Sequence, residues 1–179
     1  MAHVIRFGAL LRCAFLMLVL VTRPAAASQP DLLEWRDAKS LPSLIHHLEE
    51  WLDRNTDLPR ASKMPNVRQI GLAYAAHLHA AIHSSRQNTT RGLYDPHEAT
   101  IYLVRPWDRQ NPFDVAVLLH ELVHHRQREH GHWYCPGAQE LPAYRIQKQW
   151  LAELGLEADI NWIAVVLEAG CTPRDIHPD

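Results

Sequence analysis

The stretch from His120 to His124 carries the residue types of a metal-dependent hydrolase. It is His120-Glu121-Leu122-Val123-His124, within a strongly helical segment. Residues four apart on a helix lie on one face, so the imidazoles of His120 and His124 can bind one cation. Glu121 lies beside them, where its carboxylate can reach an activated water without binding the metal. We therefore predict a Zn²⁺ site with His120 and His124 as ligands and Glu121 as general base.

A catalytic zinc site usually has three protein ligands and a water, and two residues compete for the third position. Glu140 begins the next predicted helix. His130 completes the pattern H-E-x-x-H-x-x-G-x-x-H, except that Gln127 replaces the glycine that turns the chain back toward the metal. On an unbroken helix, His130 lies about 240° around the axis from His124. The pattern therefore favours Glu140. Further candidates are His132, Glu129 and Glu153.

A second pair of histidines, His79 and His83, has the same four-residue spacing. No acidic residue stands between them, and the pair has no apolar setting of its own. We therefore predict ordinary histidines here rather than a second metal site.

The first 27 residues have the pattern of a secretory signal peptide. A basic start precedes the apolar run Cys13–Val21, and Ala25-Ala26-Ala27 supplies a cleavage site. The apolar run has nine residues, whereas a membrane-spanning helix needs about 20. We expect a bacterial protein exported to the periplasm or beyond, with no stable membrane anchor after cleavage. Residues 28–179 then form one domain.

Charge and cysteine content indicate which classes of partner residues 28–179 can bind and whether they contain a disulfide. Loss of Arg6, Arg12 and Arg23 leaves 15 of the 18 basic residues against 20 acidic ones, a formal charge of −5. No basic stripe appears, so we expect no nucleic-acid partner. Cys135 and Cys171 remain, and in an exported protein this pair predicts a disulfide. We expect a monomer that binds a peptide or protein substrate.

Periodicity predicts the elements around the motif. Helices are expected at 42–54, 73–82, from about 111 through the motif, from about 140 to Gly155, and at 160–169 after a cap at Asp159 or a neighbour. A short strand is expected at 67–70, and a hairpin with arms at 93–94 and 100–104. This order predicts an α+β fold, mostly helical, with a small antiparallel sheet next to the motif helix.

A hairpin is followed by a helix with H-E-x-x-H and then by a helix that begins with Glu140 and continues through Ala143 and Tyr144. The order of these elements resembles that of the gluzincin branch of the zincin metallopeptidases. The chain is also similar to small exported bacterial H-E-x-x-H proteins of unassigned function, with Cys135-Pro136-Gly137 before the third ligand. The resemblance covers residues 92–154, and Pro142 departs from it.

The resemblance implies that His120, His124 and Glu140 bind zinc and that Glu121 is the general base. It also implies an edge strand above the metal that pairs with extended peptide, here Thr100–Val104.

The oxyanion of the transition state needs a partner besides zinc. Tyr144 lies one turn after Glu140 and faces the same way, so it is the preferred candidate, either there or orienting the ligand. Tyr134, His132 and His125 are further candidates. The predicted function is zinc-dependent hydrolysis of peptide bonds outside the cytoplasm. The alternatives are a zincin-fold binding module without turnover and a hydrolase of a non-peptide amide.

Overall fold

A computed structural model describes residues 33–82 and 91–171 of the chain. The expected signal peptide, His83 and the side chain of His79 lie outside what it describes. Within the described ranges, no helix is long and apolar enough to cross a membrane.

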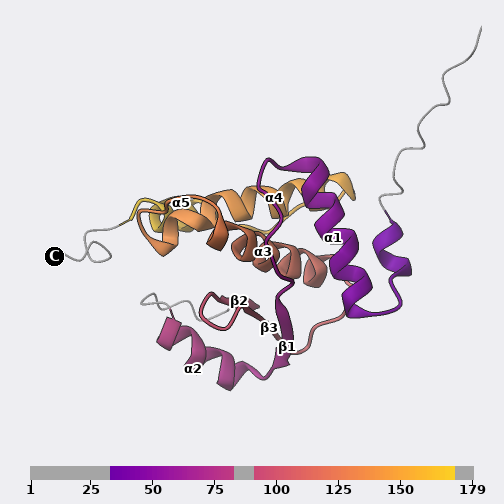
Figure 1. The fold of residues 1–179 in the computed structure, drawn as a ribbon, viewed down its shortest axis with the longest axis horizontal. Helices are drawn as coiled ribbons and strands as arrows, with labels where there is room; N and C mark the ends of the chain where they lie inside the picture. Colours follow the sequence, from indigo (N-terminus) through magenta and orange to yellow (C-terminus); the bar gives the residue numbers. More distant parts are fainter. Residues whose placement is uncertain (1–32, 83–90, 172–179) are drawn as a thin grey trace, which may run out of the picture.

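Helices dominate the described part of the chain, and a small sheet completes an α+β fold, as predicted (Figure 1). In chain order the elements are η1 (Glu34–Asp37), α1 (Leu41–Asn55), β1 (Asn66–Ile70), α2 (Leu72–Ile82), β2 (Gly92–Asp95), β3 (Thr100–Val104), α3 (Pro112–Glu129), η2 (Pro136–Gln139), α4 (Glu140–Glu153) and α5 (Trp162–Ala169). The predicted elements agree closely. The last helix begins later than expected, because the Asn161 side chain, rather than Asp159, caps it by accepting from the Ala164 backbone N–H.

The sheet differs from the prediction in two ways. β2 and β3 form the expected antiparallel hairpin, but β1 pairs with β3 in parallel, so the sheet is mixed. Its order is β1-β3-β2, which places β3 in the centre with every residue buried. The prediction that Thr100–Val104 is the edge strand is therefore wrong. The edge nearest the motif helix is β2.

The motif helix α3 lies in the middle of the fold, with α4 along it and the sheet against another side (Figure 1). The Asn111 side chain caps its start by accepting from the Phe113 N–H at 2.9 Å. The apolar core joins α1, α3, β3 and α4, and its fully buried members include Leu44, Leu48, Leu52, Ile101, Leu103, Leu118, Leu119, Leu122 and Leu151.

A buried ion pair fastens α3 to α1. Arg126 is 0% exposed, and its guanidinium donates to the Glu49 carboxylate at 3.0 Å and to Asp53 at 2.7 Å. It also donates to the carbonyl oxygens of Glu49 and Leu58, both at 2.8 Å. A buried charge persists where its hydrogen bonds are satisfied in this way. Arg126, two residues after the last motif histidine, therefore fixes α3 in the core.

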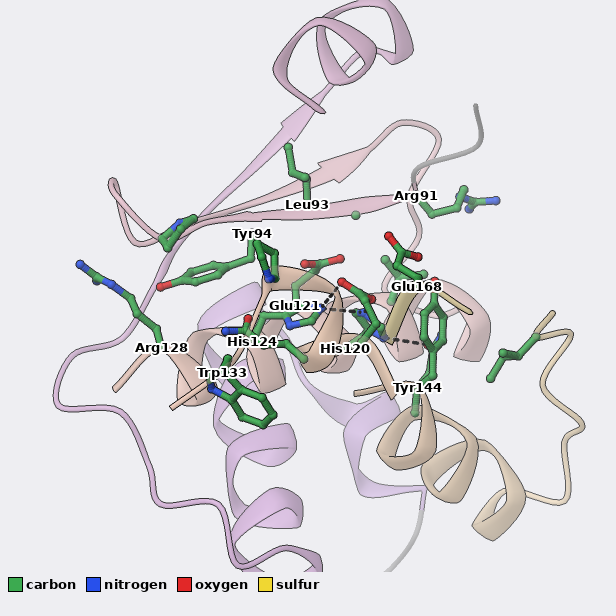
Figure 2. Close-up of a pocket in the computed structure, with 18 of the residues that line it drawn as sticks. Arg91, Leu93, Tyr94, His120, Glu121, His124, Arg128, Trp133, Tyr144 and Glu168 are labelled. Atoms are coloured by element: carbon green, nitrogen blue, oxygen red, sulfur yellow. Dashed lines mark hydrogen bonds and ion pairs between the residues drawn. The ribbon is translucent and has the colours of Figure 1, made fainter. Parts of the chain in front are cut away.

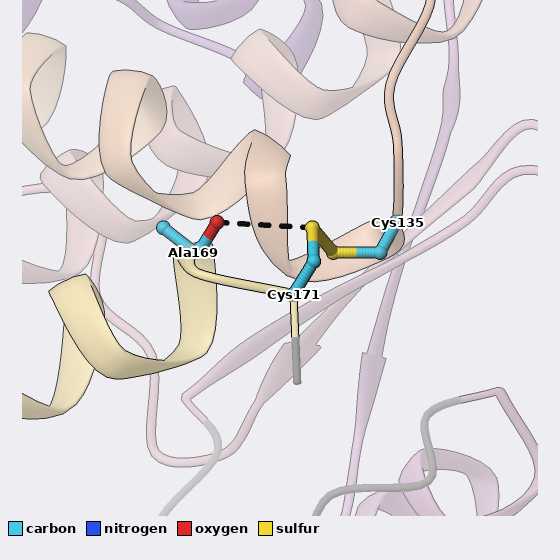
Figure 3. Close-up of a disulfide and its surroundings, with 3 residues drawn as sticks. All are labelled: Cys135, Ala169 and Cys171. Atoms are coloured by element: carbon cyan, nitrogen blue, oxygen red, sulfur yellow. Dashed lines mark hydrogen bonds between the residues drawn. A yellow bond between two sulfur atoms is a disulfide. The ribbon is translucent and has the colours of Figure 1, made fainter. Parts of the chain in front are cut away.

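The predicted disulfide between Cys135 and Cys171 is present (Figure 3). It joins the residue before η2 to the end of α5. Close packing supports this connection, because a Cβ on Gly137 would lie only 2.4 Å from the Glu168 carbonyl oxygen. The covalent bond therefore holds the segment that leads directly into Glu140.

Candidate metal centre

The three predicted ligand side chains converge on one point between α3 and α4. The Nε2 atoms of His120 and His124 lie 2.9 Å apart. The Glu140 carboxylate places one oxygen 3.3 Å from His120 Nε2 and the other 3.3 Å from His124 Nε2. All three residues are buried or nearly so. Two helices therefore bring together residues up to twenty positions apart, and the residue beside the two motif histidines is Glu140, the preferred candidate.

The donor atoms fit zinc in type and spacing. Zinc is bound by imidazole nitrogen and carboxylate oxygen at about 2.0–2.2 Å, and a tetrahedral arrangement places such donors about 3.3 Å apart. The two histidine–carboxylate separations are 3.3 Å, and the two imidazole nitrogens lie closer together, at 2.9 Å. Two nitrogens and one carboxylate also match the ligand set of catalytic zinc sites, which leave a position for water.

Gln127 determines which nitrogen of His124 faces the centre. Its side-chain N–H donates to the Gln139 carbonyl oxygen at 3.0 Å, so the amide oxygen must point the other way. That oxygen lies 2.8 Å from His124 Nδ1 and accepts its proton. In the neutral ring, Nε2 of His124 then presents a lone pair to the other ligands, and this is the tautomer that binds a metal. Gln127 also connects α3 to the residue before Glu140.

Gln147 has the corresponding place beside the other imidazole. Its side-chain oxygen lies 3.2 Å from His120 Nδ1. Neither glutamine was predicted as part of the site. Helical spacing contained the signal, because Gln127 is three residues after His124, and Gln147 is seven residues after Glu140, two turns along the same face.

Charge is concentrated at the centre. Burial alone lowers the pKa of His124, but the Glu140 carboxylate overcomes this and raises it to about 9. Burial alone raises the pKa of Glu140, and the neighbouring His124 and His120 reverse this and hold it far below its usual range. Glu140 is therefore an ionised carboxylate that is stabilised by positive charge beside it, which a proton on His124 or a divalent cation could supply.

Glu121 lies against the sheet edge. Burial raises the pKa of its carboxyl, while the adjacent His120 and His124 act in the opposite direction. A Cβ on Gly92 would lie 2.6 Å from Glu121 Oε1 and 2.6 Å from Val117 Cγ1. Glycine at this position of β2 therefore lets the strand approach α3 and leaves the Glu121 carboxylate at the cavity wall (Figure 2).

Tyr144 extends from α4 into the same cavity, with its ring against His120 (Figure 2). The two ring centroids are 4.4 Å apart. Burial and the Glu140 carboxylate raise the pKa of the Tyr144 hydroxyl to about 12. The hydroxyl therefore keeps its proton over the ordinary pH range and is available as a hydrogen-bond donor.

The other candidates for the third ligand lie elsewhere or outside the cluster. His130 is the residue after the end of α3. Glu129 accepts from the backbone and side chain of Ser62, and Glu153 accepts from the Trp51 indole. His132 and Tyr134 line the cavity, but His132 is not part of the ligand cluster. His125 is buried and bonded to Tyr94 and to the Lys63 carbonyl oxygen, which leaves it no role at an oxyanion.

An open cavity of about 840 Å³ surrounds the centre. The three ligands, Glu121 and Tyr144 line it on the helical side. The opposite wall is the edge strand β2, from Gly92 to Tyr94, and the loop residues Trp133 and Tyr134 contribute aromatic surface. A catalytic site needs such an entry path, whereas a purely structural zinc site is closed.

Comparison with known proteins gives a family for the chain and no activity. A family model described as a domain of unknown function (DUF6647) matches residues 37–179, which include every residue of the centre. No curated protein and no solved structure gives a match. The chain belongs to this DUF6647 family.

Proposed function

We propose that this DUF6647 protein is a zinc-dependent peptidase that acts outside the cytoplasm. One observation carries the proposal: two imidazole nitrogens and a carboxylate meet at zinc-like distances, with a second carboxylate beside them, in an open cavity. A structural zinc site needs neither the fourth group nor the opening.

The residues of the centre have two roles, metal binding and proton transfer. His120, His124 and Glu140 would hold the ion. When bound, zinc supplies Lewis acidity, polarising a carbonyl and lowering the pKa of water to roughly 7. Glu121 takes the proton of the attacking water and delivers it to the leaving nitrogen. Its burial favours the protonated form more than an exposed carboxylate would, which suits a group that must hold the proton between these two steps.

Tyr144 is the donor that we assign to the developing oxyanion. Its hydroxyl stays protonated because of burial and the Glu140 carboxylate, and its ring is packed against His120. Such a fixed donor acts where charge develops in the transition state.

A peptide is the substrate class that the cavity wall favours. Within the part of the chain that the structure describes, β2 pairs with β3 alone, and its residues Gly92, Leu93 and Tyr94 line the cavity. An extended peptide can add to such an edge through main-chain hydrogen bonds, and this places a peptide bond beside the ligands. The disulfide Cys135–Cys171 supports an oxidising compartment, in agreement with the expected signal peptide.

The test compares the full chain with its Glu121→Gln form. We expect both proteins to bind one zinc ion per chain, measured by elemental analysis after gel filtration. Only the unmodified protein should cleave members of a peptide library, followed by mass spectrometry. The matched control is Gln149→Leu, an exposed change on α4, which should retain both zinc and cleavage.

Two results would contradict the proposal. Failure of the unmodified protein to bind zinc removes the metal centre. Zinc bound with no cleavage by either protein removes the peptidase and favours a binding module.

A further inference from the structure

We propose that Arg128 forms a subsite for a carboxylate of the bound substrate, next to the metal centre. This rests on the cavity being a peptide-binding site, as proposed above, but it adds a preference that the metal ligands do not specify. The carboxylate is either an acidic side chain or the C-terminus of the peptide.

The position of Arg128 follows from the helix that carries the motif. It comes four residues after His124, so it lies on the same side of α3, about 6 Å further along the axis. Its side chain lines the same cavity and is exposed. An extended peptide advances about 3.3 Å per residue, so Arg128 faces a group about two residues from the bond at the metal.

Tyr94 and His125 form a series of buried hydrogen bonds next to Arg128. His125 Nε2 donates to the Lys63 carbonyl oxygen at 2.6 Å, so in the neutral ring Nδ1 is an acceptor. The Tyr94 hydroxyl donates to that Nδ1 at 3.0 Å. Burial raises the pKa of Tyr94, and the nearby Arg128 guanidinium opposes this rise. Figure 2 shows Arg128 beside the hydroxyl end of the Tyr94 ring. The neighbour of Arg128 is thus a fixed, neutral hydroxyl.

The described residues supply no counter-ion for the positive charge of Arg128. Within residues 33–82 and 91–171, no carboxylate lies at ion-pair distance from it. The two acids nearest along the chain and sheet are engaged elsewhere: Glu129 accepts from Ser62, and Asp95 accepts from the backbone of the turn after β2.

Arg91, on the other side of the ligands, provides the contrast (Figure 2). It also lines the cavity, but it is paired with the buried Asp114 carboxylate. The two cations of the cavity wall are therefore unequal: Arg91 is neutralised by the protein, and Arg128 is available to a ligand. A guanidinium presents a fork of donors that fits a carboxylate.

Binding to the zinc-loaded Glu121→Gln form tests the subsite without requiring cleavage. The probes are fluorescent alanine-based hexapeptides in which one Glu is moved through the positions, matched by a Gln series. Each is made with a free or an amidated C-terminus, and affinity is measured by fluorescence anisotropy. The variants are Arg128→Met, Arg128→Lys and the control Arg145→Met, an exposed arginine outside the cavity lining.

We expect one Glu position, or the free C-terminus, to bind about tenfold more tightly than its uncharged counterpart. Arg128→Met should abolish this ratio and leave the affinity of the uncharged peptide unchanged. Arg128→Lys should retain part of the ratio, and Arg145→Met all of it. The position of the effect distinguishes a side-chain carboxylate from the C-terminus.

Three results overturn the proposal: no preference for a carboxylate, a preference that survives Arg128→Met, or no binding of any peptide. Absence of cleavage by the unmodified protein would instead defeat the peptidase while these affinities still decide the subsite.

Discussion

Helix α3 contacts α1 and α4 through buried charges, but the two contacts differ in what completes them. Toward α1, Arg126 supplies the positive charge for Glu49 and Asp53, and the contact is complete with protein atoms alone. Toward α4, the Glu140 carboxylate faces two imidazoles that are neutral unless they take up a proton.

This difference separates a structural contact from a binding site within one helix. The guanidinium of Arg126 is permanently charged, so the α1 contact is indifferent to ions in solution. The α4 contact has a carboxylate without a permanent partner, and a proton on His124 or a metal ion satisfies it. We infer that the α1 contact contributes to stability without any ion, whereas the charge balance at the α4 contact depends on what binds beside Glu140.

The largest expected effect comes from breaking the α1 contact. Arg126→Met removes the buried partner of the Glu49 carboxylate and leaves only the partly exposed Arg60, at 3.6 Å, so we expect the free energy of unfolding to fall by about 3–5 kcal/mol. Arg60→Met is the matched control, because Arg60 reaches the same two carboxylates from a side chain that is 39% exposed. Its cost should stay below about 1 kcal/mol. Urea unfolding measures both.

A further variant keeps this prediction testable. Adding Glu49→Met to Arg126→Met removes the lone charge and should recover much of the loss. Equal destabilisation by Arg126→Met and Arg60→Met would mean that the buried pair is not what holds α3 to α1.

The second effect concerns the α4 contact and zinc affinity. Gln127→Leu removes the acceptor that orients His124, and loss of such a partner typically costs 10- to 100-fold in metal affinity. We expect the zinc dissociation constant to rise by about that factor, measured by competition with a chromogenic chelator. Gln149→Leu on the exposed side of α4 should leave it unchanged. An unchanged constant in the Gln127 variant would show that the glutamine does not position the ligand.

The smallest expected effect is the pH dependence of the stability that Asp53, the partly exposed carboxylate of the α1 contact, contributes. Burial alone raises the pKa of Asp53, but Arg60 and Arg126 lower it below the ordinary 3.8. A lowered folded-state pKa contributes stability above the unfolded pKa and loses it as the pH falls. Because this side chain is 43% exposed, we expect Asp53→Asn to cost less than about 1 kcal/mol at pH 7.

Urea unfolding from pH 7 downward checks this sign. The difference between the unmodified protein and Asp53→Asn should shrink as the pH approaches 3.8 and below. A difference that grows on acidification would contradict the assigned contacts.

From the sequence, His120, His124 and Glu140 were expected to lie together, as they do, but the sheet edge was assigned to the wrong strand. Helical spacing is a local property, so the common face of His120 and His124 follows from the chain itself. Pro142 fits the first turn of α4 as expected, since Glu140 begins that helix.

Strand order depends on distant pairing, and no local pattern in Thr100–Val104 revealed its parallel partner β1, which lies on the far side of α2 in the sequence. All five residues of β3 are buried, as is typical of a central strand. A strand at a sheet edge can have much the same composition, so composition did not distinguish the two positions. The sheet edge beside the candidate ligands was therefore assigned to the wrong arm of a correctly predicted hairpin.

In the sequence, Gln127 is informative because it replaces the glycine of the longer motif; in the structure, it orients His124. Its presence argued correctly against the glycine-dependent third histidine. Its bonds to His124 and to the Gln139 carbonyl oxygen depend on the position of α4, which periodicity alone does not supply.

The bond between Cys135 and Cys171 has a practical consequence for anyone who produces this protein. It spans 36 positions and fastens the end of α5 to the residues that deliver Glu140. Material made in a reducing cytoplasm, or cut short before Cys171, lacks this tether, and its metal content would report on the preparation rather than on the native centre. Zinc-binding measurements therefore require protein that was folded under oxidising conditions and that retains Cys171.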